Sequence, residues 1–137
     1  MIKLSLTEEK ILIEDLENLE RALNISLPNS YKELMIEFNG GIPEKEYFKG
    51  GYGISTFYPI KNGENNIEIV METIQDILPK DFFPFGDDMG GNDFCIDLSE
   101  ENYGKVYLII WEDDDPVFLT NSFEEFLEGL TEIKEDF

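Results

Sequence analysis

Two spacings of apolar residues alternate along this chain, one typical of helices and one typical of strands. The helical spacing of three and four residues predicts a first helix, capped by Thr7 and ended by Asn24 in a left-handed conformation. A second helix begins at Leu27 and Pro28, because proline in the first turn lacks an N–H that would be unbonded anyway, and ends at Gly40. The residues expected to face the core are Leu12, Leu16, Leu19 and Leu23 in the first helix and Tyr31, Leu34, Met35 and Phe38 in the second.

The middle of the chain combines a loop, a strand and a third helix. Glycines, Pro43 and scattered charges predict a loop over residues 42–53, and β-branched and aromatic residues predict a strand over 54–58. Asn66 can cap a helix that stops before Pro79. Its apolar face comprises Ile67, Val70, Met71, Ile74 and Ile77.

The last third is typical of an antiparallel meander closed by a helix. Strands are predicted at 82–85, 94–98, 105–111 and 117–120, joined by turns rich in glycine and aspartate. Ser122 and Glu125 fit a capping box for the final helix. The succession of helices, strands and a helix predicts an α+β fold, with a central, mainly antiparallel sheet flanked by helices, in a single domain over residues 1–137.

Composition supports a folded chain and restricts its partners. A length of 137 residues suits one core, and 42% apolar residues with eleven Phe argue against a disordered acidic tail. The formal charge of −21 repels phosphate backbones, so we expect no direct nucleic-acid binding and favour a basic partner. No apolar run approaches the roughly 20 residues that cross a bilayer, so we expect no membrane association.

The charge is distributed unevenly along the chain. Residues 1–80 carry fourteen acids and eight bases, a net charge of −6, whereas residues 81–137 carry seventeen acids and two bases, a net charge of −15. Plain solubility explains a high net charge as well as a binding role does. The asymmetry nevertheless favours a binding face in the second half.

This chain lacks the residues that several kinds of catalysis require. With no histidine, the usual general base and the usual zinc ligand are missing, so we expect no catalytic site and no cofactor. The glycine-rich stretch at 50–56 has Thr56 where a dinucleotide-binding motif needs its third glycine. The lone Cys95 cannot form an internal disulfide and lies in an apolar strand, which predicts an inert thiol. The first ten residues lack a secretory signal pattern, so we expect a cytoplasmic protein.

The sequence GDDMGGND, residues 86–93, is the stretch most like a ligand site. Asp87, Asp88, Asn92 and Asp93 could offer oxygen ligands to a hard cation, but the spacing does not fit the EF-hand template. A turn fixed by aspartate or asparagine side chains is the favoured interpretation, with Asp87 or Asn92 bonded to loop backbone. Whether the loop also binds a cation stays open, and we expect none. Its remaining acids would face a partner.

The sequence WEDDDP, residues 111–116, places four acids after a strand that ends in an aromatic residue. Adjacent carboxylates diverge, which argues against a catalytic pair, and Pro116 favours a solvated turn. A charged loop beside an aromatic side chain suits protein binding, although burial of Trp111 in the core is an equally good interpretation. The candidate partner-binding residues are therefore Asp87, Asp88, Asn92, Asp93, Trp111, Glu112, Asp113, Asp114 and Asp115.

Four segments in order along the chain resemble the SUKH superfamily, the Smi/Knr-like proteins related to a yeast regulator of cell-wall synthesis. They are LPNSYKELMIEFNGG (27–41), FFPFGDDMGGNDFCIDL (82–98), YGKVYLIIWEDDD (103–115) and SFEEFLEGL (122–130). The resemblance implies the same α+β fold and a role in protein binding. Bacterial members resemble immunity proteins, which bind and neutralise a toxin domain, often a nuclease, in the cytoplasm.

Charge and resemblance together predict an immunity protein that binds a cognate, basic, nuclease-type toxin. A regulatory or scaffold module of the Smi/Knr type without a toxin partner is the alternative. The sequence leaves open which toxin is bound and whether the protein is a monomer or a homodimer.

Overall fold

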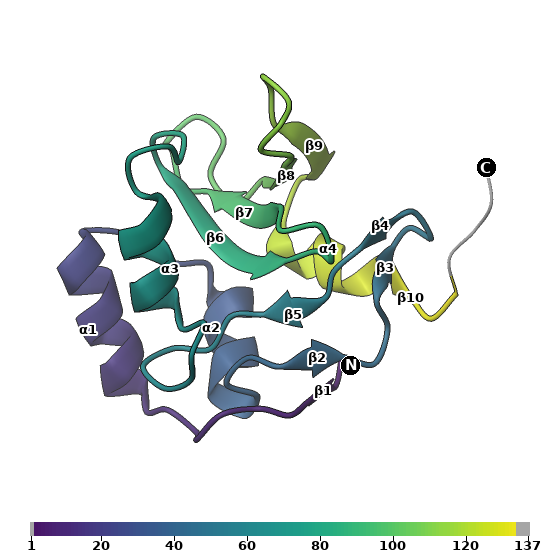
Figure 1. Ribbon diagram of the computed structural model, residues 1–137. Coiled ribbons are helices and arrows are strands. Elements are labelled where there is room, and N and C mark those ends of the chain that lie inside the picture. Colours follow the sequence, from purple (N-terminus) through teal and green to yellow (C-terminus); the bar gives the residue numbers. More distant parts are fainter. Residues whose placement is uncertain (1, 134–137) are drawn as a thin grey trace.

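The computed structural model describes residues 2–133 and arranges them in four helices and ten strands (Figure 1). The helices are α1 (Ile13–Leu23), α2 (Asn29–Glu37), α3 (Ile67–Ile74) and α4 (Phe123–Glu128). The longer strands are β6 (Phe82–Asp87), β7 (Asp93–Asp97), β8 (Val106–Ile109) and β9 (Val117–Thr120). The two-residue strands are β1 (Leu4–Ser5), β2 (Ile42–Pro43), β3 (Tyr47–Phe48), β4 (Tyr52–Gly53), β5 (Thr56–Phe57) and β10 (Leu130–Thr131).

The main sheet is an antiparallel meander of five strands in the order β5-β6-β7-β8-β9. Asp87 on β6 lies opposite Asp93 on β7, which in turn lies opposite Ile109 on β8. The β6–β7 and β8–β9 turns therefore leave the sheet at the same end. The predicted meander and the α+β class are both confirmed.

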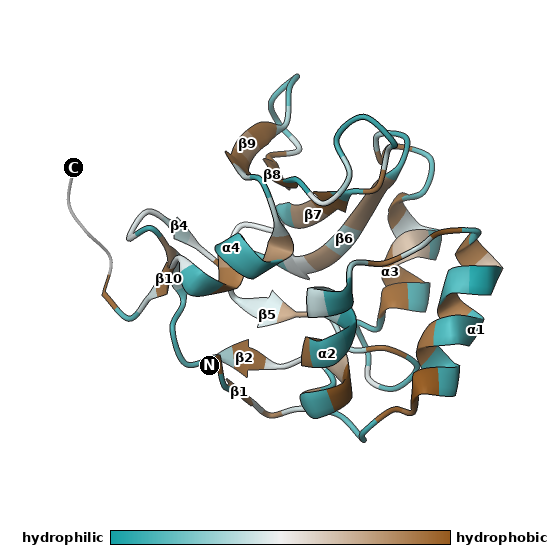
Figure 2. Ribbon diagram, turned by 180° about the vertical axis from the view of Figure 1, so that it is seen from behind, coloured by the Kyte–Doolittle hydropathy of each residue, from teal (hydrophilic) through white to brown (hydrophobic). Residues whose placement is uncertain are grey.

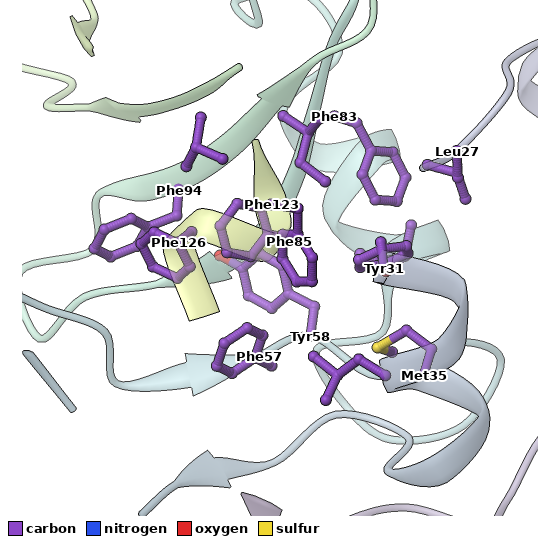
Figure 3. Packing of buried hydrophobic residues seen from close by; sticks show 14 of the residues in the cluster. Leu27, Tyr31, Met35, Phe57, Tyr58, Phe83, Phe85, Phe94, Phe123 and Phe126 are labelled. Carbon is purple, nitrogen blue, oxygen red and sulfur yellow. The ribbon is translucent and has the colours of Figure 1, made fainter. Parts of the chain in front are cut away.

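Helices α2 and α4 pack on one face of this sheet, and α4 lies behind the sheet in Figure 1 and in front of it in Figure 2. The core between them is aromatic: the Phe85 ring centroid lies 5.0 Å from that of Phe123 and 5.3 Å from that of Phe126. Tyr31 of α2 meets Phe83 edge to face at 5.3 Å, as Figure 3 shows. Such aromatic pairs stabilise beyond their buried area, by about 0.5–1.5 kcal/mol each.

The predicted start of the first helix is wrong. The helix begins at Ile13, where the Asp15 carboxylate accepts the Leu12 backbone N–H at 2.8 Å, and Thr7 lies outside it. Leu12 is consequently 68% exposed and does not join the core, whereas Leu16 and Leu19 do. Asn24 ends the helix at a φ of 54°, as predicted.

The predicted caps of the later helices are confirmed in part. Asn66 Oδ1 accepts the N–H of Ile69 at 3.0 Å, and Ser122 Oγ accepts the N–H of Glu125 at 3.1 Å. In a full capping box, the Glu125 carboxylate would also accept the Ser122 backbone N–H. Among residues 2–133 this bond is not made, because the Glu125 carboxylate accepts the Thr120 hydroxyl instead. Helix α3 stops at Ile74, earlier than predicted, so Ile77 lies beyond the helix and is 64% exposed.

The predicted loop over residues 42–53 contains three short strands. Phe48 on β3 pairs with Leu130 on β10, and this small sheet joins the middle of the chain to its C-terminal part. The Phe48 ring stacks on Phe126 with centroids 5.0 Å apart. Two-residue strands are too short to show a period, which explains why the pattern of apolar residues missed them.

Candidate protein-binding site

The fold joins the two acidic segments that the sequence presents separately. The backbone N–H of Trp111 donates to Asn92 Oδ1 at 3.2 Å, and the indole Nε1 of Trp111 donates to Asp93 Oδ2 at 2.8 Å. Residues 87–93 and 111–115 therefore form one surface at one end of the main sheet, which we call the acidic end. All nine candidate residues belong to these two segments, and eight of them are at least partly exposed.

Asp88 fixes the shape of the β6–β7 turn. Its Oδ1 accepts the N–H groups of Gly90 and Asn92 at 2.8 and 2.9 Å, and its Oδ2 accepts the Asn92 side-chain amide at 3.0 Å. We expected Asp87 or Asn92 in this role; Asn92 instead uses its side-chain oxygen to bond the neighbouring segment. The turn is therefore held by side chains of its own, and no group of three or more His, Cys, Asp or Glu within residues 2–133 is placed to hold a metal ion.

Asp93 is an internal anchor of the acidic end. It is only 5% exposed, and its two oxygens accept the Tyr58 hydroxyl at 2.5 Å and the Trp111 indole at 2.8 Å. Burial raises the pKa of Asp93, while these two hydrogen bonds act in the opposite direction. Asp93 therefore positions Trp111, and its carboxylate is not exposed to a partner.

Asp87 is a second perturbed carboxyl group of the site. Its carboxylate is half-buried, and Oδ1 has no hydrogen-bond partner among the described residues. Burial, with added repulsion from Asp93 and Asp88, raises the pKa of Asp87 to about 6. A weakly acidic carboxyl group therefore lies beneath the exposed loops.

The exposed charge of the acidic end comes from Glu112, Asp113, Asp114 and Asp115. The Asp113 N–H donates to the Ile110 carbonyl at 2.8 Å, which confirms a turn. In the part of the chain that the structure describes, all three ion pairs use acids before residue 80: Glu17, Glu20 and Asp15. The four loop carboxylates thus face solvent without a neutralising cation from residues 2–133.

Comparison with known proteins places the chain in a family. A model of the SMI1 / KNR4 family (SUKH-1) matches residues 10–129. The chain belongs to this family. The match contains the first three segments that carried the resemblance and nearly all of the fourth, so the predicted family is confirmed.

A relative of this SMI1 / KNR4 family protein occurs in Bacillus subtilis (strain 168). The chain is 28% identical over 147 residues to the SPbeta prophage-derived uncharacterized protein YokK, and the match covers 87% of this chain and 74% of YokK.

No helix within residues 2–133 is both long enough and apolar enough to cross a membrane.

This family member also carries an aromatic stripe that the sequence analysis missed. Phe82, Tyr107 and Phe118 lie on the sheet face opposite α2 and α4, with centroids 5.1 Å apart for Phe82–Tyr107 and 5.6 Å apart for Tyr107–Phe118. Phe118 is 50% exposed, and Lys105 lies 5.9 Å from its ring centroid. The stripe forms because the strand register places Tyr107 opposite Phe118. The sequence of one strand alone does not predict it.

The acids of the second half do not form a single face. Glu100 and Glu101 lie in the β7–β8 turn, at the opposite end of the main sheet, and Glu124 and Glu128 lie on α4. Among the described residues, only the acidic end has four consecutive exposed carboxylates, Glu112–Asp115, and they follow Trp111, which Asp93 holds by a hydrogen bond. This combination makes it the best candidate for partner binding.

Proposed function

We propose that this protein is an immunity protein that binds a cognate toxin domain with a basic, nuclease-type active site in the cytoplasm of the producing cell. The observation that carries the proposal is the exposed run Glu112–Asp115, which has no ion-pair partner within residues 2–133 and lies beside a half-buried Trp111. The family includes toxin-immunity proteins, which supports the same role.

The physical basis is mimicry of a polyanion. A nuclease binds phosphates in a positive groove, and a dense carboxylate surface is attracted to the same groove. Long-range attraction steers the encounter, with association rates raised by about 10- to 10³-fold. The bound loops then block access of nucleic acid to the groove, so one set of charges serves both steering and inhibition.

Two parts of the acidic end are held in place before binding. Asp88 holds the β6–β7 turn and Asp93 holds Trp111, so this turn and this indole lose little freedom on association. Trp111 is half-buried, and an indole with one edge exposed is a common anchor at protein interfaces. This arrangement supports a tight complex without catalytic groups on the immunity protein.

Complex formation with the product of the adjacent gene tests the proposal. We expect the wild-type protein to co-purify with that product and to block its toxicity when both are expressed. The variant Asp113→Lys/Asp114→Lys should lose at least about tenfold in affinity, because two attractive charges become repulsive. Glu100→Lys/Glu101→Lys makes the same charge change at the other end of the sheet and serves as the control.

If both variants lost affinity equally, net charge alone would explain the loss. That result would contradict binding through the acidic end. Lack of any complex with, or protection from, the adjacent gene product would contradict the immunity role.

The family is also named for SMI1 and KNR4. A regulatory module without a toxin partner is therefore the second candidate, and an isolated gene with no toxin-like neighbour would favour it.

A further inference from the structure

A groove between α1 and α2 forms a second surface, separate from the acidic end. Its volume is about 500 Å³, and none of the nine candidate residues lines it. Its apolar lining comes from Ile13 and Leu16 of α1 and Ile36 of α2. The two helices bring together residues more than twenty positions apart in the sequence.

One residue that lines this groove, Ile13, is an exposed aliphatic side chain, and its neighbour in sequence, Leu12, is exposed as well. Ile13 is 67% exposed in the first turn of α1, and the preceding Leu12 is 68% exposed. The helix begins late, so these two residues stay outside the core that Leu16 and Leu19 enter. Two adjacent aliphatic residues at a helix start offer apolar surface to a partner.

The rim of the groove is acidic. Glu17, Glu33 and Glu37 line it as exposed side chains, and Lys32 is the one base in the lining. Lys32 lies 3.6 Å from Glu20, which also accepts the Leu27 N–H at 2.8 Å. Glu33 and Glu37 have no ion-pair partner within residues 2–133, so the rim attracts a positively charged ligand.

The walls of the groove determine the shape of its ligand. Both walls are helices, and the backbone groups in their middle turns are bonded within the helix. An extended peptide would find few backbone partners here, whereas a helical ligand satisfies its own backbone. Helix α1 has eleven residues and is about 16 Å long, which matches about three turns of a bound helix.

We propose that the α1–α2 groove binds a basic amphipathic helix of a protein partner. The apolar face of that helix packs on Ile13 and Ile36, above the buried Leu16, and its Lys or Arg side chains pair with Glu33 and Glu37. This surface is independent of the acidic end, so the proposal does not depend on the immunity role.

A synthetic helix tests the proposal. The probe is a Leu–Lys peptide of about five turns with its leucines at helical spacing, and the control peptide has the same composition with alternating leucines. In ¹⁵N-labelled protein, we expect the helical probe to shift the amide signals of residues 13–37. Ile13→Ser and Glu33→Lys/Glu37→Lys should each weaken binding by at least about tenfold.

Two matched variants separate this site from general charge attraction. Ile77→Ser removes an isoleucine of similar exposure, 64%, outside the groove, and Glu72→Lys reverses an exposed acid on α3. Both should bind the probe like wild type. The proposal is overturned if the alternating peptide binds equally well, if Ile13→Ser and Glu33→Lys/Glu37→Lys both bind normally, or if the shifts fall on residues 87–93 and 111–115. Concentration-dependent shifts of residues 13–37 without peptide would likewise overturn it, because a second copy would then cover the groove.

Discussion

Asp93 is the residue that couples the sheet to the acidic end. Its carboxylate is buried and accepts one hydrogen bond from Tyr58 and one from Trp111. Hydrogen bonds to a charged acceptor are stronger than neutral ones, and a buried oxygen left without a donor is costly. Tyr58 comes from the end of a short edge strand, far from both acidic segments in sequence. No sequence pattern indicates that it contributes to this site.

Tyr58→Phe removes one donor to Asp93 and keeps the ring. We expect the free energy of unfolding at pH 7 to fall by about 1–3 kcal/mol, because one Asp93 oxygen loses its partner in a buried site. Urea unfolding followed by fluorescence measures the change. Tyr107→Phe is the control, since its hydroxyl makes no hydrogen bond within residues 2–133, and it should change the value by less than about 0.5 kcal/mol. Equal values for the two variants would show that the Asp93 contact does not stabilise the fold.

Asp87→Asn tests the half-buried carboxyl group. Folding raises the pKa of Asp87 from 3.8 to about 6, so the folded state holds the proton more tightly than the unfolded state. This residue therefore favours folding below pH 4, and that contribution is lost as pH rises through about 6. We expect Asp87→Asn to be more stable than wild type at pH 7 by about 1–2 kcal/mol, with the difference shrinking towards pH 4. A constant difference between the two proteins over this range would contradict the raised pKa.

At the scale of elements, the sequence predicts what depends on local spacing. The strands of the meander, the Asn24 stop and the Asn66 and Ser122 caps all follow from residues within a few positions of one another. The two-residue strands depend on distant contacts, such as Phe48 with Leu130. The segment before α1 likewise contacts a distant residue, since Glu8 forms a β-bridge with Asn39. The joining of the two acidic segments depends on strand register, which pairs Asp93 with both Asp87 and Ile109. Register is a property of the assembled sheet, so each segment was recognised but their contact was not.

Asp88→Ala should loosen the β6–β7 turn without unfolding the sheet. The change removes acceptors of the Gly90 and Asn92 amides and of the Asn92 side chain. We expect amide hydrogen exchange at Gly90 and Asn92 to accelerate at least about tenfold, while exchange in β7 and β8 stays unchanged. Asp113→Ala, which lies in the neighbouring exposed turn, is the matched control. Unchanged exchange at Gly90 and Asn92 would show that backbone preference alone holds the turn.

At the scale of the whole molecule, net charge by itself does not define a binding face. The seventeen acids after residue 80 give that part of the chain its charge of −15, yet most of the described ones are divided between the two ends of the main sheet and α4. The acidic end differs from the other two places in carrying four consecutive exposed carboxylates, directly after Trp111. The predicted concentration of charge in sequence therefore corresponds to several surfaces, of which we propose the acidic end as the interface.

The salt dependence of association tests the central claim most directly. The rate of binding to the adjacent gene product would be measured by stopped flow between about 0.02 and 0.5 M salt, for the wild type, Asp113→Lys/Asp114→Lys and Glu100→Lys/Glu101→Lys. We predict that the wild-type rate falls at least about tenfold over this range, and that reversal at the acidic end flattens the dependence much more than reversal at the opposite end. A rate that changes with neither salt nor reversal of Asp113 and Asp114 would contradict binding through the acidic end.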